Sequence, residues 1–322
     1  MSLTETSELI LGTISPKDKP WDAHRLCADK VQALYLAAQN GRYAERIQRC
    51  GQTLEFAFRT NDEAQIALTL RSAHFCRVRH CPTCQWRRSM KWTAKMFQAM
   101  PAVTAAYPTH RWMFLTLTVK NCAIADLRST LSYMNRAFER LTKLRSWPAI
   151  GWVKSVEVTR SETTGEAHPH LHVLMLVPPG YFTGKGYIKQ ETWRETWQRC
   201  LRSDYLPVVN VKSVRAKNGP SDAQKEGTDS AIARAICETL KYTVKEADLV
   251  ADADWLAQLT TQLHKTKAVA IGGILKGYMK DEREDDDLIH LDENGITVDD
   301  EKDPSVWFGW REAISHYVKI ER

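Results

Sequence analysis

Apolar and polar positions alternate along the central part of the chain in blocks that predict strands and helices in turn. Stretches rich in β-branched and aromatic residues predict strands at 112–119, 152–159, 168–177 and 208–214. Apolar residues at helical spacing predict helices at 123–143, 190–201 and 229–245. In the first of these helices, Leu127, Leu131, Met134, Phe138 and Leu141 fall on one face.

The predicted element order is β-α-β-β-α-β-α, with the turn at 162–166 joining the second and third strands. A tight β-β connection between two crossovers is typical of the split βαβ, or ferredoxin-like, arrangement. The sequence therefore predicts an α+β fold whose antiparallel sheet is backed by helices.

Two flanking regions complete the predicted organisation. Residues 21–48 have helical periodicity with a break at Asn40-Gly41, and a cysteine cluster and a further helix follow before residue 100. After residue 250 we expect a helix, a turn at Gly272-Gly273, an acidic loop and a final aromatic segment. We expect an N-terminal helical and zinc-binding region at 1–108, a central domain at 109–249 and a C-terminal extension at 250–322.

The charge distribution indicates a polyanionic partner. The 322 residues carry a net charge of +6, but segment 281–303 alone holds twelve acidic residues and two basic ones, so the remainder carries +16. A body this basic attracts nucleic acid. No apolar run is long enough for a membrane span and the N-terminus is polar, which together with the cysteine usage favours a reducing cytoplasm and no membrane partner.

Three histidines occupy alternate positions of the third predicted strand: His168, His170 and His172. Strand geometry directs them to one face, where two imidazoles can share a metal ion. Glu157 on the preceding strand is the expected third ligand, and His168 competes for that role. This donor set suits Mn²⁺ or Mg²⁺ near a phosphate, and also Fe²⁺ or Zn²⁺.

A second candidate group lies at the end of the helix predicted at 229–245. On a helix, Glu238 and Tyr242 at i and i+4 share a face, and Lys245 follows three residues later. A tyrosine beside a metal ion and a lysine can serve as a nucleophile, because both cations favour the phenolate.

Cys76, Cys81 and Cys84 have a spacing typical of a zinc knuckle. A fourth ligand is needed, and the candidates are Cys50, His74 and His80; we favour Cys50 and hence a Cys₄ zinc site. A bound zinc ion would hold nearby basic residues in a fixed array able to contact DNA. These are Arg77, Arg79, Arg87, Arg88 and Lys91.

Four segments, in this order and spacing, resemble the motifs of rolling-circle plasmid replication initiators of the Rep_1 type, which are HUH (His-hydrophobe-His) endonucleases. They are Phe114–Lys120, Glu157–Thr159, His168–Leu174 and Lys241–Lys245. The resemblance covers roughly residues 50–280, and a cysteine in a pattern like Arg49-Cys50-Gly51 also belongs to it.

The resemblance implies that residues 109–249 form a nickase domain. It implies that His170 and His172 hold a divalent metal ion, Mn²⁺ or Mg²⁺, and that Tyr242 attacks the scissile phosphate to give a 5′-phosphotyrosine and a free 3′-OH. Glu238 matches the glutamate that activates water for the terminating cleavage. The implied partners are double- and single-stranded plasmid origin DNA, together with a host helicase and polymerase.

Three alternatives remain at this stage. A relaxase or transposase would use the same HUH chemistry. A non-catalytic zinc DNA-binding regulator would not need the histidines or the tyrosine. An iron oxygenase with a His₂-carboxylate site would depend on Fe²⁺ and have no affinity for DNA.

Overall fold

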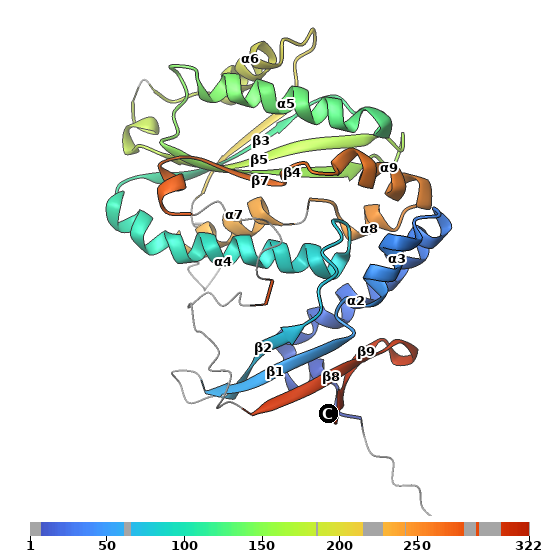
Figure 1. The fold of residues 1–322 in the computed structure, drawn as a ribbon. Helices are drawn as coiled ribbons and strands as arrows, with labels where there is room; N and C mark the ends of the chain where they lie inside the picture. Colours follow the sequence, from blue (N-terminus) through green and yellow to red (C-terminus); the bar gives the residue numbers. More distant parts are fainter. Residues whose placement is uncertain are drawn as a thin grey trace, which may run out of the picture. The chain divides into compact units, whose positions relative to one another are not determined.

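The computed structural model describes residues 8–60, 66–184, 186–214, 228–241, 243–279, 288–289 and 304–321 (Figure 1). The chain divides into two compact units: unit 1 holds residues 1–91, 249–257 and 284–322, and unit 2 holds residues 92–248 and 258–283. The described residues form two antiparallel sheets and nine α-helices, so the predicted α+β class is confirmed. The three-domain division expected from the sequence stays a prediction.

The five-stranded sheet lies in unit 2 and has the strand order β6-β3-β5-β4-β7. Its strands are β3 (Arg111–Thr118), β4 (Gly151–Arg160), β5 (Ala167–Val177), β6 (Val209–Ser213) and β7 (Val269–Gly273). Its helices are α4 (Pro82–Ala106), which begins in unit 1, α5 (Leu127–Thr142), α6 (Gln190–Leu201), α7 (Thr228–Leu240) and α8 (Glu246–Leu249). Helix α9 (Ala253–Leu263) ends in this unit.

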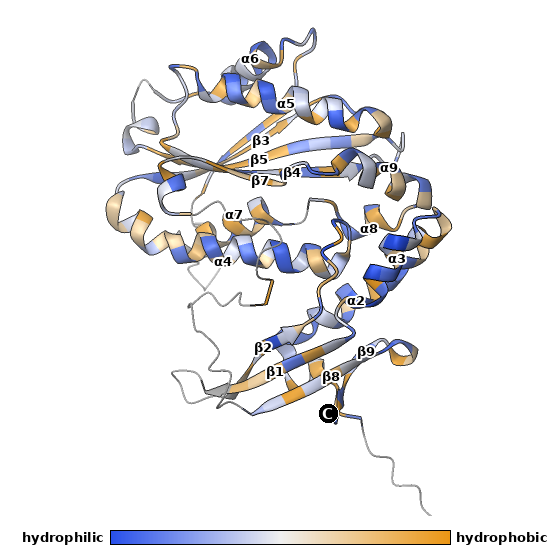
Figure 2. Ribbon diagram, in the orientation of Figure 1, coloured by the Kyte–Doolittle hydropathy of each residue, from blue (hydrophilic) through white to orange (hydrophobic). Residues whose placement is uncertain are grey.

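Helices cover both faces of this sheet, α5 and α6 on one side and α4 and α7 on the other (Figure 1). All five apolar positions predicted for one face of α5 are buried. On the opposite side, Trp92 and Met96 of α4 and Ile236 of α7 pack in one core with Leu174 of β5. Figure 2 shows many apolar positions along these strands, as expected for a sheet covered on both faces.

Lys154 of β4 is a charged residue buried between the sheet and α5, with 8% of its surface exposed. Its ammonium donates to Asn135 and lies 4.9 Å from the centre of the Phe138 ring. Burial lowers the pKa of Lys154 to about 8, so the folded state binds its proton less tightly than the unfolded chain does.

We therefore expect Lys154→Met to raise the free energy of unfolding at pH 7 by about 1–3 kcal/mol, at roughly 1.4 kcal/mol per pKa unit. As pH rises from about 8 towards the higher pKa that lysine has in the unfolded chain, the free energy of unfolding of the wild-type protein increases. The reason is that in this range Lys154 keeps its proton in the unfolded state and loses it in the folded state. The advantage of the variant should shrink over the same range. Urea unfolding at pH 7 and pH 10 measures this, and a variant less stable than wild type at pH 7 would contradict it.

The four-stranded sheet lies in unit 1 and has the order β2-β1-β8-β9. Its strands are β1 (Thr53–Thr60), β2 (Ile66–Ala73), β8 (Ser305–Arg311) and β9 (His316–Ile320). This sheet was not predicted from the sequence pattern. It joins strands from the two ends of the chain, with Leu54 opposite Phe308, and both side chains are fully buried.

Helices α1 (Leu11–Ile14), α2 (Pro20–Ala37) and α3 (Gly41–Gln48) precede this sheet. Pro20 opens α2 at a position where its missing N–H costs nothing. The predicted break at Asn40-Gly41 is confirmed, since α3 begins at Gly41. Trp21 of α2 packs against Phe56 of β1 with their ring centres 6.5 Å apart.

Two predicted boundaries are wrong. The helix predicted to end at residue 245 ends at Leu240, because the chain then pairs with β4: the Val158 N–H donates to the Thr243 carbonyl at 2.8 Å. Gly272-Gly273 is the end of β7 rather than a separate turn. Gly272 is required because a Cβ there would lie 2.1 Å from the Trp152 ring, and Gly273 has φ of +59°.

Candidate metal and catalytic sites

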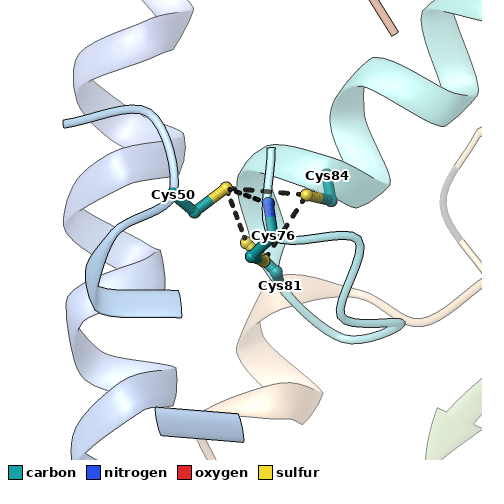
Figure 3. A group of neighbouring side chains, drawn as sticks. All are labelled: Cys50, Cys76, Cys81 and Cys84. Atoms are coloured by element: carbon teal, nitrogen blue, oxygen red, sulfur yellow. Dashed lines mark hydrogen bonds between the residues drawn. The ribbon is translucent and has the colours of Figure 1, made fainter. Parts of the chain in front are cut away.

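Cys50, Cys76, Cys81 and Cys84 gather in unit 1 with all four sulfur atoms within 4.8 Å of one another (Figure 3). The sulfur of Cys50 lies 3.6 Å from that of Cys84 and 3.7 Å from that of Cys81. A tetrahedral zinc ion with Zn–S bonds of about 2.3 Å has sulfur atoms about 3.8 Å apart. The predicted four-cysteine group is confirmed, and its dimensions fit a tetrahedral ion.

The surrounding backbone is arranged to stabilise thiolates. The Cys76 N–H points at the Cys50 sulfur and the Val78 N–H at the Cys76 sulfur, each at 3.4 Å. Burial raises the pKa of the Cys81 thiol well above its usual value, so this sulfur needs a neighbouring cation to ionise. Of the other candidate ligands, His74 is exposed and His80 is buried outside the cluster.

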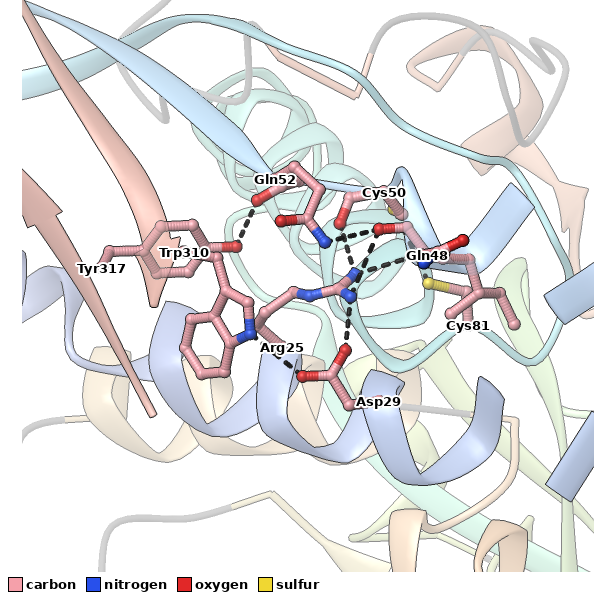
Figure 4. A network of polar contacts seen from close by, with 10 residues as sticks. Arg25, Asp29, Gln48, Cys50, Gln52, Cys81, Trp310 and Tyr317 are labelled. Carbon is pink, nitrogen blue, oxygen red and sulfur yellow. Dashed lines mark hydrogen bonds and ion pairs between the residues drawn. The ribbon is translucent and has the colours of Figure 1, made fainter. Parts of the chain in front are cut away.

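A buried arginine holds Cys50 in position (Figure 4). Arg25 of α2 is 1% exposed and donates to the carbonyl of Cys50 at 2.6 Å and to that of Ile47 at 2.9 Å. Its charge is paired with Asp29, which also accepts a hydrogen bond from the Trp310 indole at 3.0 Å. Residues from α2 and β8 thus support one ligand of the cysteine site.

The basic residues expected to contact DNA separate into two groups. Arg77 is exposed, and Arg79 and Arg88 are half-buried; Arg88 donates to the Arg77 carbonyl at 3.1 Å, which fixes the loop between the cysteines. Arg87 and Lys91 are buried, at 4% and 5% exposure. Arg87 donates to the Leu288 carbonyl at 2.8 Å and lies over aromatic rings, so the structure does not bring it to the surface.

In unit 2, the sheet register brings the histidines and Glu157 to one face. His170 lies directly opposite Glu157 of β4, and His168 lies opposite Thr159. On the other side of β5, His172 lies opposite Thr116 of β3. Directly paired residues share a face of a sheet, so these side chains all point to the side covered by α4 and α7.

His172 and Glu157 are in direct contact, with 2.6 Å between Nε2 and Oε2. The other ring nitrogen of His172 lies 3.3 Å from the Thr116 hydroxyl. His168 is nearest His170, with ring centres 4.1 Å apart. The structure therefore groups all four predicted ligands, although among the described residues only the cysteines have every ligand atom within 4.8 Å.

Lys241 also belongs to this group, although no role was predicted for it from the sequence. Its ammonium lies 3.5 Å from the second oxygen of Glu157 and donates to Glu238 at 2.6 Å. Burial alone would lower the pKa of Lys241, but the hydrogen bond to Glu238 and the charge of Glu157 raise it, so the residue stays charged. Its position directly before Tyr242 in the sequence could have indicated that Lys241 belongs to this site.

The protonation states suit metal binding. Burial lowers the pKa of His170 to about 4, so its imidazole is neutral near pH 7. Burial would raise the pKa of Glu157, but the hydrogen bond from His172 and the charges nearby lower it overall, so the carboxylate is ionised. His170 Nδ1 is buried without a hydrogen-bond partner in the described part of the chain, whereas Glu157 Oε1 lies 3.5 Å from the Lys241 ammonium. The His170 nitrogen is thus available to a cation, and Glu157 adds a charged oxygen beside it.

The remaining predicted catalytic residues lie in the last turn of α7 or follow it. Tyr242 lies outside the described residues, but both its neighbours are described: Lys241 reaches Glu157, and Thr243 is hydrogen-bonded to β4. The interpretation that Glu238 and Tyr242 share a helix face is wrong, because α7 ends between them. Lys245 is exposed.

None of the helices in the described part of the chain is long and apolar enough to cross a membrane.

Comparison with known proteins gives one consistent result. Residues 67–318 match the Rep_1 family, described as "Replication protein". A "Protein rep" of Streptococcus pneumoniae serotype 2 (strain D39 / NCTC 7466) is 32% identical over 94% of this chain and 93% of its own length. A "Protein rep" of Lentilactobacillus hilgardii is 35% identical over 92% of each chain. No solved structure gives a significant match. The chain therefore belongs to the Rep_1 family of replication proteins.

Proposed function

We propose that this chain initiates rolling-circle plasmid replication by nicking one strand at the origin and later rejoining it, with unit 2 as a ferredoxin-like HUH nickase domain. The observation that carries the proposal is the contact between His172 and Glu157 on a face shared with His170 and Lys241. Membership of a replication protein family supports it independently.

The donor set of this group fits a divalent cation. His170 supplies a neutral nitrogen, His172 a second imidazole nitrogen and Glu157 a charged oxygen, and His170 Nδ1 is buried without a hydrogen-bond partner among the described residues. His168 is a further ligand candidate through its contact with His170. A bound Mn²⁺ or Mg²⁺ would polarise the non-bridging oxygens of the scissile phosphate.

The protein residues then have distinct tasks. The Tyr242 oxygen forms a bond to phosphorus while the bond from phosphorus to the 3′ oxygen breaks, and that oxygen leaves as a 3′-OH with a proton from solvent. The phosphoester is conserved as a 5′-phosphotyrosine, so rejoining needs no external energy source. Lys241 is adjacent to Tyr242 and stays charged, so it favours the phenolate form of a nucleophile whose ordinary pKa is about 10. Lys245 is a second cation for the same task.

In unit 1, the cysteine cluster is proposed to hold a structural zinc ion. The ion would stabilise the loop of residues 76–81, and Arg77, Arg79 and Arg88 on and beside that loop would contact phosphates of double-stranded origin DNA. The single strand exposed by nicking would occupy unit 2. Host helicase and polymerase are the proposed protein partners, since a 3′-OH needs both to be extended.

One assay tests the central proposal. The protein is incubated with supercoiled or single-stranded origin DNA and Mn²⁺, and the products are examined for a covalent DNA–protein adduct. An adduct excludes both the non-catalytic regulator and the iron oxygenase. A relaxase or transposase would also give one, and is distinguished by whether the released 3′-OH primes plasmid synthesis.

Glu238 is proposed to activate water for the terminating cleavage. It is exposed and bonded to Lys241, so it can face the same phosphate without being needed for the first attack. Glu238→Ala should therefore still nick and attach through Tyr242, but release by hydrolysis should fall by about 10²-fold or more. The ratio of covalent to released product, followed over time, measures this.

Lys241→Met is the matched comparison for that experiment. If Glu238 serves only to orient Lys241, the two variants should lose nicking and release together, and adduct should not accumulate in either. Accumulation in Glu238→Ala alone identifies the carboxylate as the base. Glu238→Gln keeps the shape of the side chain and should behave like Glu238→Ala.

A further inference from the structure

A cavity of about 460 Å³ adjoins the histidine group in unit 2. Its volume lies within the range of roughly 300–1,000 Å³ found for small-ligand pockets. His172 forms part of its wall, so whatever occupies the cavity is a direct neighbour of the group proposed to hold the scissile phosphate.

The floor of the cavity is the sheet face beyond His172. Phe114 lies opposite Lys212, and Thr116 lies opposite Asn210, because β3 pairs with the edge strand β6. The Phe114 ring is stacked on His172 with ring centres 5.5 Å apart. An aromatic ring, an exposed amide and an exposed ammonium therefore line one surface.

The opposite wall is a single face of α7. Ala231, Arg234, Ala235 and Glu238 line the cavity and follow the spacing i, i+3, i+4 and i+7 that places residues on one side of a helix. The two alanines have short side chains, which leaves the space between helix and sheet open. Arg234 and Glu238 border the same space with charges of opposite sign.

We propose that this cavity binds one nucleotide of the single-stranded origin, the one adjoining the nicked phosphate, and so contributes to the choice of nick site. Phe114 offers a surface for base stacking, which tolerates any base. The Asn210 amide both donates and accepts hydrogen bonds and can distinguish base edges. Lys212 and Arg234 favour the phosphate. This inference rests on the proposed function.

The test begins by mapping the nick that the wild-type protein makes in a supercoiled plasmid carrying the origin. Single strands spanning the nick are then synthesised with one abasic site at each flanking position in turn. Their binding is measured at fixed salt without added divalent ion. For wild type, one position beside the nick should weaken binding about tenfold when its base is missing, because the stacking contact of that base is lost.

Two variants locate that effect in the cavity. Ala235→Leu fills the space, and the abasic site at the sensitive position should then change binding less than twofold. Asn210→Ala, an exposed substitution that leaves the core intact, should relax discrimination among the four bases there. Ala233→Leu, on the same helix but outside the cavity lining, is the control and should match wild type.

The outcomes separate the two proposals. A wild-type protein that makes neither nick nor adduct would overturn the proposed function. A wild-type nick with a flat abasic profile, or a profile unchanged in both Ala235→Leu and Asn210→Ala, would overturn the nucleotide site alone. If Ala235→Leu does not fold, Asn210→Ala decides.

Discussion

Tyr242→Phe should abolish the covalent DNA–protein product while leaving binding to origin DNA within a few-fold of wild type. The substitution removes the only oxygen of this side chain able to form the phosphoester and keeps its ring. Denaturing gel electrophoresis of labelled origin strand, after incubation with Mn²⁺, measures the adduct. Binding to the same strand shows that the variant is folded.

The residues next to Tyr242 provide controls for this result. Lys241→Met should slow adduct formation without abolishing it, because the nucleophile remains and only its ionisation is less favoured. Lys245→Met, at an exposed position, should have the smaller effect of the two. An adduct that persists in Tyr242→Phe would mean that another residue is the nucleophile.

The second large effect separates the two proposed metal sites. Cys81→Ser or Cys84→Ser should lose about one zinc ion per chain, measured by metal analysis of the purified protein. Zinc binding at structural sites also stabilises the fold. A loss of about 5 kcal/mol would lower the melting temperature by about 10–20 °C. Cys237→Ser, at an exposed cysteine outside the cluster, should change neither quantity.

Substitution at the histidine group should have the opposite pattern. His170→Ala and His172→Ala should lose cleavage and divalent-ion binding in unit 2 while retaining the zinc content of wild type. Chelation of the zinc should unfold unit 1 in wild type and in these variants alike. Zinc content unchanged in both cysteine variants would overturn the zinc site.

Local sequence patterns were sufficient to predict most of the strands and helices of unit 2. Strands β3, β4 and β5 begin and end within one residue of their predicted bounds, and α6 matches its prediction at both ends. Alternation along a strand, joined by a short turn, was enough to bring Glu157 and the histidines to one face. The cysteine spacing likewise predicted three members of the four-cysteine group, and Cys50 was the favoured one of three candidates for the fourth.

What the sequence did not predict depends on pairing between distant segments. One partner of β1 is β8, about 250 residues later, and no local sequence pattern identifies it. Helical periodicity continues past Leu240, but pairing of Thr243 with β4 ends the helix, and so Lys241 rather than Lys245 contacts Glu157. Arginine is usually exposed, so Arg87 was expected at the surface. It is instead buried, and the Leu288 and Ile289 carbonyls accept its hydrogen bonds.

The pairing of β1 with β8 has a consequence for synthesis on the ribosome. Domains generally fold as they emerge, N-terminal parts first, yet β1 must wait until residues 305–311 have been made. Until then the backbone N–H and C=O groups along this edge of β1 are unpaired. Trp310 and Tyr317 are also not yet present to donate hydrogen bonds to Asp29 and to the Gly51 carbonyl beside Cys50. Unit 2, which ends at residue 283, can be complete earlier. A message truncated before β8 would therefore yield a chain with a finished five-stranded sheet and an unsupported cysteine cluster, prone to aggregation through its unpaired strand.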